Sequence, residues 1–379
     1  MTCQGKSKIN KLKLSRYPLI PEDQFLAYDA GDQYILNHLT DSETEYQRIL
    51  VIEDDFGAIG SGLEAEHIIF VNDSILARRG IINNFEQNNL DISNISFISP
   101  YEVFPDDIDL IILKIPKVNK YLDFLLNKLN KYYNPDIPFI AGGMVKYLNS
   151  TIYKLFQSNL GDFSYSLTWK KAKIITGKLS GVSLDKDFTT ILKDLDISLI
   201  NFPNLFSSNR VDIGSRFLIM NLSNISLPAN ADKIIDVGSA NGILGLSLGR
   251  YYPKANFWLT DISFSAYESA LATIKVNNFD SSRINLVINN SLDSFQANFA
   301  DLIIINPPFH EKHKISIKTA HSIFMDCARV LKENGLLIVV ANRHLGYHKY
   351  LPKLFSQTQI IQQNSKFFIL KAAKPIKLR

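Results

Sequence analysis

The segment Asn306, Pro307, Pro308 and Phe309 has residue types that suit a specific chemistry. An exocyclic amine on a purine or an amide is a poor nucleophile, because its lone pair is delocalised into the neighbouring π system. The Asn306 side-chain oxygen and the Pro307 carbonyl are acceptors that can bind the two N–H groups of such an amine and free its lone pair. The segment therefore suits the activation of an amine on a planar group.

The two prolines would hold these acceptors in place. A residue before proline is driven into extended geometry, so Pro307 restrains Asn306 and Pro308 restrains Pro307. Phe309 offers a ring face on which a planar substrate can stack. A strand-ending turn with an aromatic plug is the alternative, and the position of the segment directly after the apolar run 302–305 favours the chemical interpretation.

A second candidate site is the glycine loop 238–245, which joins a strand pattern at 233–237 to a helical one. Its glycine spacing differs from the dinucleotide fingerprint, and no phosphate-gripping GKS or GKT follows. Asp261 ends the next strand pattern, where a carboxylate can accept both ribose hydroxyls. Asn290, at the end of the third strand pattern, can reach an adenine edge. A mononucleotide or S-adenosylmethionine remains as the candidate ligand, unless the glycines serve only a tight turn.

Alternating strand and helix patterns predict that the second half is a doubly wound, mostly parallel α/β sheet. After the first strand and the glycine loop, the predicted strands are 256–261, 284–291, 301–306 and 335–344, and the predicted helices are 266–278 and 320–334. In such a sheet, ligands bind at the carboxyl ends of the strands. Asp261, Asn290 and Asn306 should therefore lie at one edge.

The first half repeats this order, which predicts a tandem duplication. Gly57 and Gly60 have the spacing of Gly242 and Gly245, and the run "DLIILKIPK" matches "DLIIINPPF". We expect two Rossmann-like domains, residues 1–182 and 183–379. Two unrelated doubly wound domains are the alternative, but the order of matched pieces holds along the whole length.

The repeats differ at the positions that could carry chemistry. Val51 stands in place of Asp236, and three carboxylates, Glu53, Asp54 and Asp55, crowd the first glycine loop. Lys114 stands in place of Asn306. We expect that the first domain kept the fold and lost the reaction.

Composition limits the class of protein. The two cysteines have no CxxC partner, and neither a signal peptide nor a membrane span of about 18 apolar residues occurs, so we expect a cytoplasmic chain in a reducing compartment. No histidine or carboxylate group has metal-ligand spacing, so no metal is expected. The net charge is only +4, but basic clusters at both ends can neutralise phosphates. The residues do not determine the oligomeric state, and a monomer is favoured.

The glycine loop with Asp236 and Asp261 resembles class I S-adenosylmethionine-dependent methyltransferases, with Ala240 where that family usually has glycine. The motifs "LAYDAGDQYIL", "DIGSRF", "DVGSANG", "INPPFH" and "ANRHL" together resemble the bacterial ribosomal RNA guanine-N2 methyltransferases, and are more similar to the large-subunit (23S) group than to the small-subunit group. The resemblance implies methyl transfer from S-adenosylmethionine to the N2 amine of a guanosine in ribosomal RNA. It also implies that the first domain holds or orients RNA, with Lys114, Lys117, Lys120, Lys170, Lys171 and Lys173 as candidate phosphate contacts.

The resemblance also assigns residues to roles. The catalytic residues would be Asn306, Pro307, Pro308 and Phe309. The cofactor would be bound by Asp236, Gly238, Ala240, Asn241, Gly242, Asp261, Ile262 and Asn290. The candidates for substrate binding are Arg210, Arg216, His310, Arg343 and His344. An ordinary structural or surface role is an equal alternative for the three arginines and His344, and it is the favoured interpretation for His310.

Three other functions stay open at this point. A small-subunit (16S) RNA guanine-N2 methyltransferase would use the same chemistry. A protein glutamine N5-methyltransferase uses a similar Asn-Pro-Pro segment but needs no duplicated basic partner domain. A noncatalytic RNA-binding assembly factor would not need an intact segment 306–309.

Overall fold

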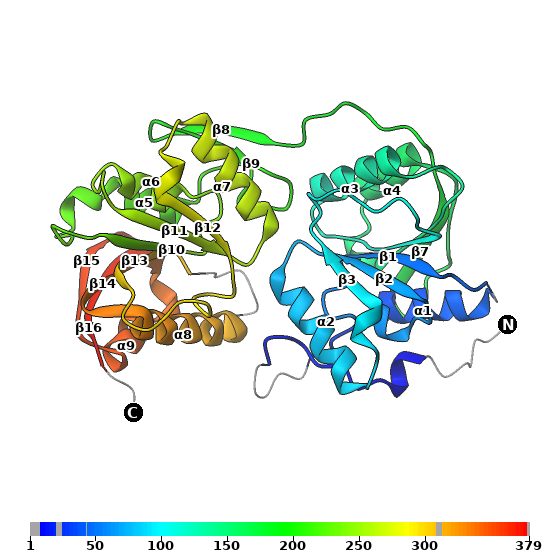
Figure 1. The fold of residues 1–379 in the computed structure, drawn as a ribbon, viewed down its shortest axis with the longest axis horizontal. Helices are drawn as coiled ribbons and strands as arrows, with labels where there is room; N and C mark the ends of the chain where they lie inside the picture. Colours follow the sequence, from blue (N-terminus) through cyan, green and yellow to red (C-terminus); the bar gives the residue numbers. More distant parts are fainter. Residues whose placement is uncertain (1–7, 20–24, 43, 308–312, 377–379) are drawn as a thin grey trace. The chain divides into compact units, whose positions relative to one another are not determined.

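The computed structural model describes residues 8–19, 25–42, 44–307 and 313–376. The chain divides into two compact units, Met1–Phe188 and Thr189–Arg379, each containing a seven-stranded sheet (Figure 1). The sequence-based boundary after residue 182 lies in the segment between the last strand of the first sheet and the first strand of the second unit.

The two sheets have the same strand order. The first sheet is ordered β3-β2-β1-β4-β5-β7-β6, and the second β12-β11-β10-β13-β14-β16-β15. The strands of the first sheet are β1 (Arg48–Ile52), β2 (His67–Val71), β3 (Ile95–Ile98), β4 (Leu110–Lys114), β5 (Pro138–Met144), β6 (Leu160–Tyr165) and β7 (Ala172–Leu179). Those of the second are β10 (Lys233–Val237), β11 (Asn256–Asp261), β12 (Ile284–Ile288), β13 (Ala300–Ile305), β14 (Leu331–Asn342), β15 (Phe355–Gln363) and β16 (Phe367–Pro375). In each sheet the first five strands are parallel, and only the sixth strand in the order, β7 or β16, runs antiparallel to both of its neighbours, which confirms the predicted Rossmann-like α/β class.

Helices cover both faces of each sheet (Figure 1). The first unit contains α1 (Ala30–Asp41), α2 (Ile75–Gln87), α3 (Asn119–Tyr132) and α4 (Ser150–Asn159), with short 3-10 turns η1 (Lys8–Lys11), η2 (Gly60–Gly62), η3 (Ile92–Asn94) and η4 (Val145–Tyr147). The second contains α5 (Ile213–Met220), α6 (Ile243–Gly249), α7 (Phe264–Val276), α8 (His313–Val330) and α9 (Tyr347–Tyr350), with η5 (Leu222–Asn224), η6 (Ser281–Arg283), η7 (Arg343–Leu345) and η8 (Leu351–Lys353).

The central strands are buried on both faces, which explains their continuous apolar runs. In β13, Ile303 and Ile305 pack into the core under α8, whereas Leu302 and Ile304 pack into the core under α5, α6 and α7. Each fully buried side chain of this kind stabilises the fold by roughly 1.5–3 kcal/mol. The run before Asn306 therefore anchors that residue rigidly at the edge of the sheet.

Some elements differ from the sequence-based expectation. The helix predicted over 320–334 ends at Val330, because Leu331 already pairs with Ala300 at the start of β14. The two-stranded sheet formed by β8 (Thr190–Asp194) and β9 (Ile197–Asn201) was not predicted. Where the second unit forms α6, the first forms only the turn η2, whose two glycines are poor helix formers.

The strand order reverses beside β10, which lies between β11 and β13. Connections from β10 and β13 therefore leave the sheet on opposite faces, and the space between their carboxyl ends is the usual binding site of such sheets. No helix in the described ranges is both long and apolar enough to cross a membrane.

Candidate active site

The loop after β10 has the backbone geometry of a tight, ligand-facing turn. Gly238 (φ +69°), Ala240 (φ +50°) and Gly242 (φ +82°) lie in the left-handed region. A Cβ built on Gly238 would meet no heavy atom within 4 Å, so the space above this residue is open. The loop thus presents backbone rather than side chains to the edge of the sheet.

Asp236 supports this loop from below. Its side chain is only 1% exposed; Gly245 N–H donates to Oδ2 (2.8 Å), and Oδ1 has no hydrogen-bond partner among the described residues. Burial raises the pKa of the Asp236 carboxyl to about 7, and the charge of Asp261 adds to the rise. A cationic or N–H-bearing ligand would satisfy Oδ1 and favour the ionised carboxylate.

Asp261, at the end of β11, bridges the same loop. Ala240 N–H donates to its Oδ2 (3.0 Å), and Ser263 N–H donates to Oδ1 (3.1 Å). A carboxylate oxygen has two lone pairs, so a carboxylate that accepts backbone N–H groups is also a suitable acceptor for hydroxyl groups such as those of a ribose. Ile262 follows with its side chain 37% exposed, as an apolar surface beside this carboxylate.

The other two residues assigned to the cofactor make internal contacts. Asn241 is buried; its Nδ2 donates to Asn201 Oδ1 (2.8 Å), and Ile243 N–H donates to its Oδ1 (3.3 Å). Asn290 is partly exposed, and its Nδ2 donates to Asp293 Oδ2 (3.2 Å). Asn290 thus lies past the end of β12, while Asn241 fixes the start of α6.

Asn306 follows β13 directly, next to the strand that carries Asp236. Neighbouring strands lie about 4.8 Å apart, so both loops border one space. The Asn306 Nδ2 donates to Asp212 Oδ2 (2.8 Å) and to Ser215 Oγ (2.9 Å). Its Oδ1 is buried and has no partner in the part of the chain that the structure describes. Pro307 is buried beside it.

Three of the assigned residues, Pro308, Phe309 and His310, lie outside the described residues. Asp212 and Ser215, by contrast, were not singled out from the sequence. The motif "DIGSRF" was used as a family signature, but only its arginine and Arg210 were assigned. The role of Asp212 and Ser215 depends on their contacts with Asn306, more than 90 positions away, and no local sequence pattern indicates such contacts.

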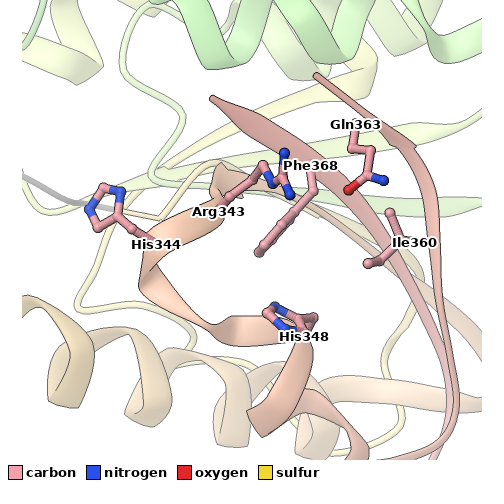
Figure 2. Close-up of a pocket in the computed structure, with 6 residues that line it drawn as sticks. All are labelled: Arg343, His344, His348, Ile360, Gln363 and Phe368. Atoms are coloured by element: carbon pink, nitrogen blue, oxygen red, sulfur yellow. The ribbon is translucent and has the colours of Figure 1, made fainter. Parts of the chain in front are cut away.

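Four of the five residues assigned to substrate binding lie in the described ranges, and all four are exposed. Arg210 lies in the turn before α5 and Arg216 in the first turns of α5. Arg343 and His344 lie in η7, directly after β14, and line a pocket of about 310 Å³ (Figure 2). Its other walls come from α9, β15 and β16: His348, Ile360, Gln363 and Phe368.

The first unit places different residues at the equivalent edge. Lys114, expected to contact phosphate, instead donates to Asp29 Oδ1 (2.6 Å) and forms an ion pair with the buried Asp32. This ion pair was not predicted, because both carboxylates lie 82 or more positions away in the sequence, and the phosphate contact of Lys114 stays a prediction. Glu53 occupies the position of Gly238 with the same left-handed backbone (φ +61°), and its side chain accepts hydrogen bonds from Tyr121 Oη (2.8 Å) and Asp73 N–H (3.1 Å).

The residues present also bear on metal binding. Among the described ranges, no group of three or more histidine, cysteine or carboxylate side chains is arranged to hold a metal ion.

Comparison with known proteins gives a consistent picture. Residues 3–181 match the family described as RLMG N-terminal domain, and residues 196–371 match the methyltransferase small domain. The ribosomal RNA large subunit methyltransferase G of Vibrio parahaemolyticus is 35% identical over 97% of this chain and 96% of its own. That of Psychromonas ingrahamii is 33% identical over 96% and 97%.

The fold also matches a solved structure. The T. thermophilus 16S rRNA N2 methyltransferase RsmC, in complex with AdoMet and guanosine, superposes with a TM-score of 0.71 at 18% identity, over 88% of this chain and 89% of that one. At this identity the likeness concerns the fold alone.

Proposed function

Because the chain belongs to the family of ribosomal RNA large subunit methyltransferases G, we propose that it transfers a methyl group from S-adenosylmethionine to the N2 amine of a guanosine in 23S ribosomal RNA. The observation that carries the proposal is the buried Oδ1 of Asn306, which has no hydrogen-bond partner among the described residues, together with the open space at Gly238 in the glycine loop. This reaction needs an amine acceptor next to a cofactor loop, and this pair of features supports the proposal.

The residues of the second unit fit the cofactor. Asp261 would bind the ribose hydroxyls, Ile262 would pack against the adenine, and Asn290 would contact the adenine edge. Gly238, Ala240 and Gly242 keep the loop backbone close to the ligand, and Asp236 would favour the positive end of the cofactor. When bound, S-adenosylmethionine supplies an electrophilic methyl group whose former bonding electrons remain on sulfur.

Asn306 and Pro307 would act on the substrate amine. The Asn306 Oδ1 and the Pro307 carbonyl accept its two N–H groups and draw the nitrogen toward tetrahedral geometry, so that its lone pair can form the new N–C bond. The nitrogen carries a positive charge until one of its protons leaves to water. Pro308 would hold Pro307 extended, Phe309 would stack on the guanine, and His310 would contact the substrate.

We also propose that basic residues beside this edge hold the RNA. Arg343 and His344 line the pocket in Figure 2, whose Phe368 and Ile360 offer apolar surface to a base and whose Gln363 offers an amide. A nucleotide flanking the target guanosine is the occupant that these groups suit. Arg210 and Arg216 would contact phosphates. Phosphate contacts position the RNA but do not distinguish one base sequence from another.

The first unit would hold RNA without binding cofactor. Glu53 fills the direction that Gly238 leaves open, and the equivalents of Asp236 and Asp261 are Val51 and Asn72. Four lysines, Lys117, Lys170, Lys171 and Lys173, are at least partly exposed and remain candidates for phosphate contact, with Lys120. The target guanosine would have to be unpaired or flipped, because pairing occupies its N2 amine. We expect a monomer that acts in the cytoplasm.

The test is incubation with methyl-labelled S-adenosylmethionine and unmodified 23S or 16S RNA, followed by digestion to nucleosides. We expect labelled N2-methylguanosine from 23S RNA only. Label on 16S RNA would keep the chemistry and overturn the substrate. Label that enters a translation factor and survives ribonuclease would favour glutamine methylation, and cofactor binding without any transfer would favour a noncatalytic RNA-binding role.

A further inference from the structure

The amide nitrogen of Asn306 is held by the first turn of α5. Both of its N–H donors are used, one by Asp212 Oδ2 (2.8 Å) and one by Ser215 Oγ (2.9 Å). An amide has no further donor, so its remaining polar atom, Oδ1, must point away from α5.

The turn is fixed by its own contacts. Asp212 is the N-cap of α5, and its Oδ2 also accepts the Ser215 N–H (2.9 Å). A Cβ on Gly214 would lie 3.0 Å from Asp212 Oδ2, 3.2 Å from Phe367 Cε1 and 3.5 Å from Asn306 Nδ2. Glycine at this position therefore leaves room for the Asp212 carboxylate and the Phe367 ring, and a side chain here would crowd the carboxylate that binds Asn306.

We infer that Asp212 and Ser215 are positioning residues that aim the Asn306 oxygen at the substrate amine, an inference that rests on the proposed function. A flipped amide would place Oδ1 against the Asp212 carboxylate, bringing two acceptors together. The carboxylate therefore permits one orientation of the amide, which is the one that leaves Oδ1 available as an acceptor.

The charge on Asp212 has a second consequence. A carboxylate that accepts from an amide N–H polarises that amide and makes its oxygen a stronger acceptor. The substrate nitrogen becomes positive as its lone pair forms the N–C bond, so a stronger acceptor on its N–H group stabilises the product side of the step more than the starting amine. The effect should therefore appear in kcat rather than in KM.

The test compares Asp212→Asn and Ser215→Ala with the matched control Asp29→Asn. Asparagine caps helices as well as aspartate, so Asp212→Asn keeps α5 and removes the charge. Asp29 is the N-cap of α1 in the first unit, and its substitution controls for an N-cap change elsewhere. We expect kcat to fall about 10–100-fold in Asp212→Asn, by analogy with the loss of residues that orient a ligand, and by a smaller factor in Ser215→Ala. The KM for RNA and the Kd for S-adenosylmethionine should change less than about twofold, and Asp29→Asn should leave kcat unchanged.

A second readout does not depend on activity. The two side-chain N–H signals of Asn306, assigned in a 15N-labelled protein by their loss in Asn306→Ala, should move in Asp212→Asn and Ser215→Ala but not in Asp29→Asn. Unmoved signals, or variants that melt earlier but turn over at the normal rate, would overturn the inference. If the wild-type chain forms no N2-methylguanosine, the proposed function fails, whereas an active wild type with an equally active Asp212→Asn removes only the positioning role.

Discussion

The carboxyl ends of β4 and β13 hold the same arrangement with different chemistry. In the second unit, Asn306 binds the N-cap residue Asp212 and the third helical residue Ser215. In the first unit, Lys114 binds the N-cap residue Asp29 and the third helical residue Asp32. The geometry of strand end and helix start is shared by the two units. The ammonium of Lys114 is paired with two carboxylates, whereas Asn306 keeps one acceptor, Oδ1, that has no partner among the described residues.

The loops after β1 and β10 show the same contrast. In the second unit Asp236 accepts the Gly245 N–H from below the loop, which leaves Gly238 facing open space. In the first unit Asp54, inside the loop, accepts the N–H groups of Ala58, Ile59 and Gly60. The backbone N–H groups that follow the two loops are thus bound by carboxylates at different positions, Asp54 in the first unit and Asp236 in the second. The difference teaches that two units with the same strand order can fix the loop after the first strand with different carboxylates and present different side chains at its tip.

The largest effect should come from placing a glutamate in the open loop. Gly238→Glu puts the side chain of Glu53 at a position with the same left-handed backbone. We expect the Kd for S-adenosylmethionine to rise by at least about 100-fold, since the glutamate side chain would occupy the space of the ligand and leave the ligand's contacts to the loop unmade. Calorimetric titration measures the Kd. Unchanged affinity would show that the ligand does not pass over Gly238.

The reverse substitution is the matched control. Glu53→Gly should not create a cofactor site, because Val51 and Asn72 occupy the positions of Asp236 and Asp261. One bound S-adenosylmethionine per chain is the expected stoichiometry for both the wild type and Glu53→Gly. Two would contradict the assignment of a single cofactor site.

Breaking the ion pair of the first unit should be the next largest effect. Lys114→Met leaves Asp29 and Asp32 without their cation. We expect the free energy of unfolding to fall by about 3 kcal/mol. This value is the lower end of the usual range for a buried ion pair, because Asp29 is 40% exposed. Each unit has one tryptophan, so Trp169 fluorescence in a Trp258→Phe background reports on this unit. Lys178→Met is the control: its 3.9 Å pair with the exposed Asp136 should contribute less than about 0.5 kcal/mol.

The stability of the second unit should depend on the proton of Asp236. Its pKa, raised by burial to about 7, exceeds the usual value in the unfolded chain, so the stabilisation is complete below pH 4 and is lost as the pH rises through 7. We expect the loss between pH 5 and pH 8 to be on the order of 2 kcal/mol. Urea unfolding followed by Trp258 in a Trp169→Phe background measures it. Asp236→Asn cannot ionise and should be flat over this range; an equally steep variant would assign the titration to another group.

The smallest effect concerns Ala240, where the family usually has glycine. Its φ of +50° is unfavourable for a residue with a Cβ by about 1–2 kcal/mol. Substitution by glycine removes this cost, but it also raises the conformational entropy of the unfolded chain, which offsets about 0.4–1 kcal/mol of the gain. Ala240→Gly should therefore stabilise the second unit slightly and change the Kd for S-adenosylmethionine less than about threefold. A large gain in affinity would mean that the Ala240 methyl group obstructs the ligand.

The sequence predicted the elements whose signals are local. Apolar runs buried on both faces identified the central parallel strands, and the repeated order of motifs indicated the duplication. The antiparallel strands β15 and β16 were less visible, because most of β15 is exposed and carries no apolar run. The site followed the same rule: Asp236, Asp261 and Asn306 end predicted strands, whereas the contacts of Asp212, Ser215 and Lys114 join distant segments and required the fold.

The proposed methyl transfer depends most directly on the acceptor oxygen of Asn306. We would measure the single-turnover rate of N2-methylguanosine formation on 23S RNA for the wild type and Asn306→Ala at saturating S-adenosylmethionine, with the cofactor Kd measured on the same samples. We predict a rate lower by about 10²–10³-fold with an unchanged Kd. A rate within about threefold of the wild type at equal Kd would contradict the assignment of the amine-activating acceptor to this residue.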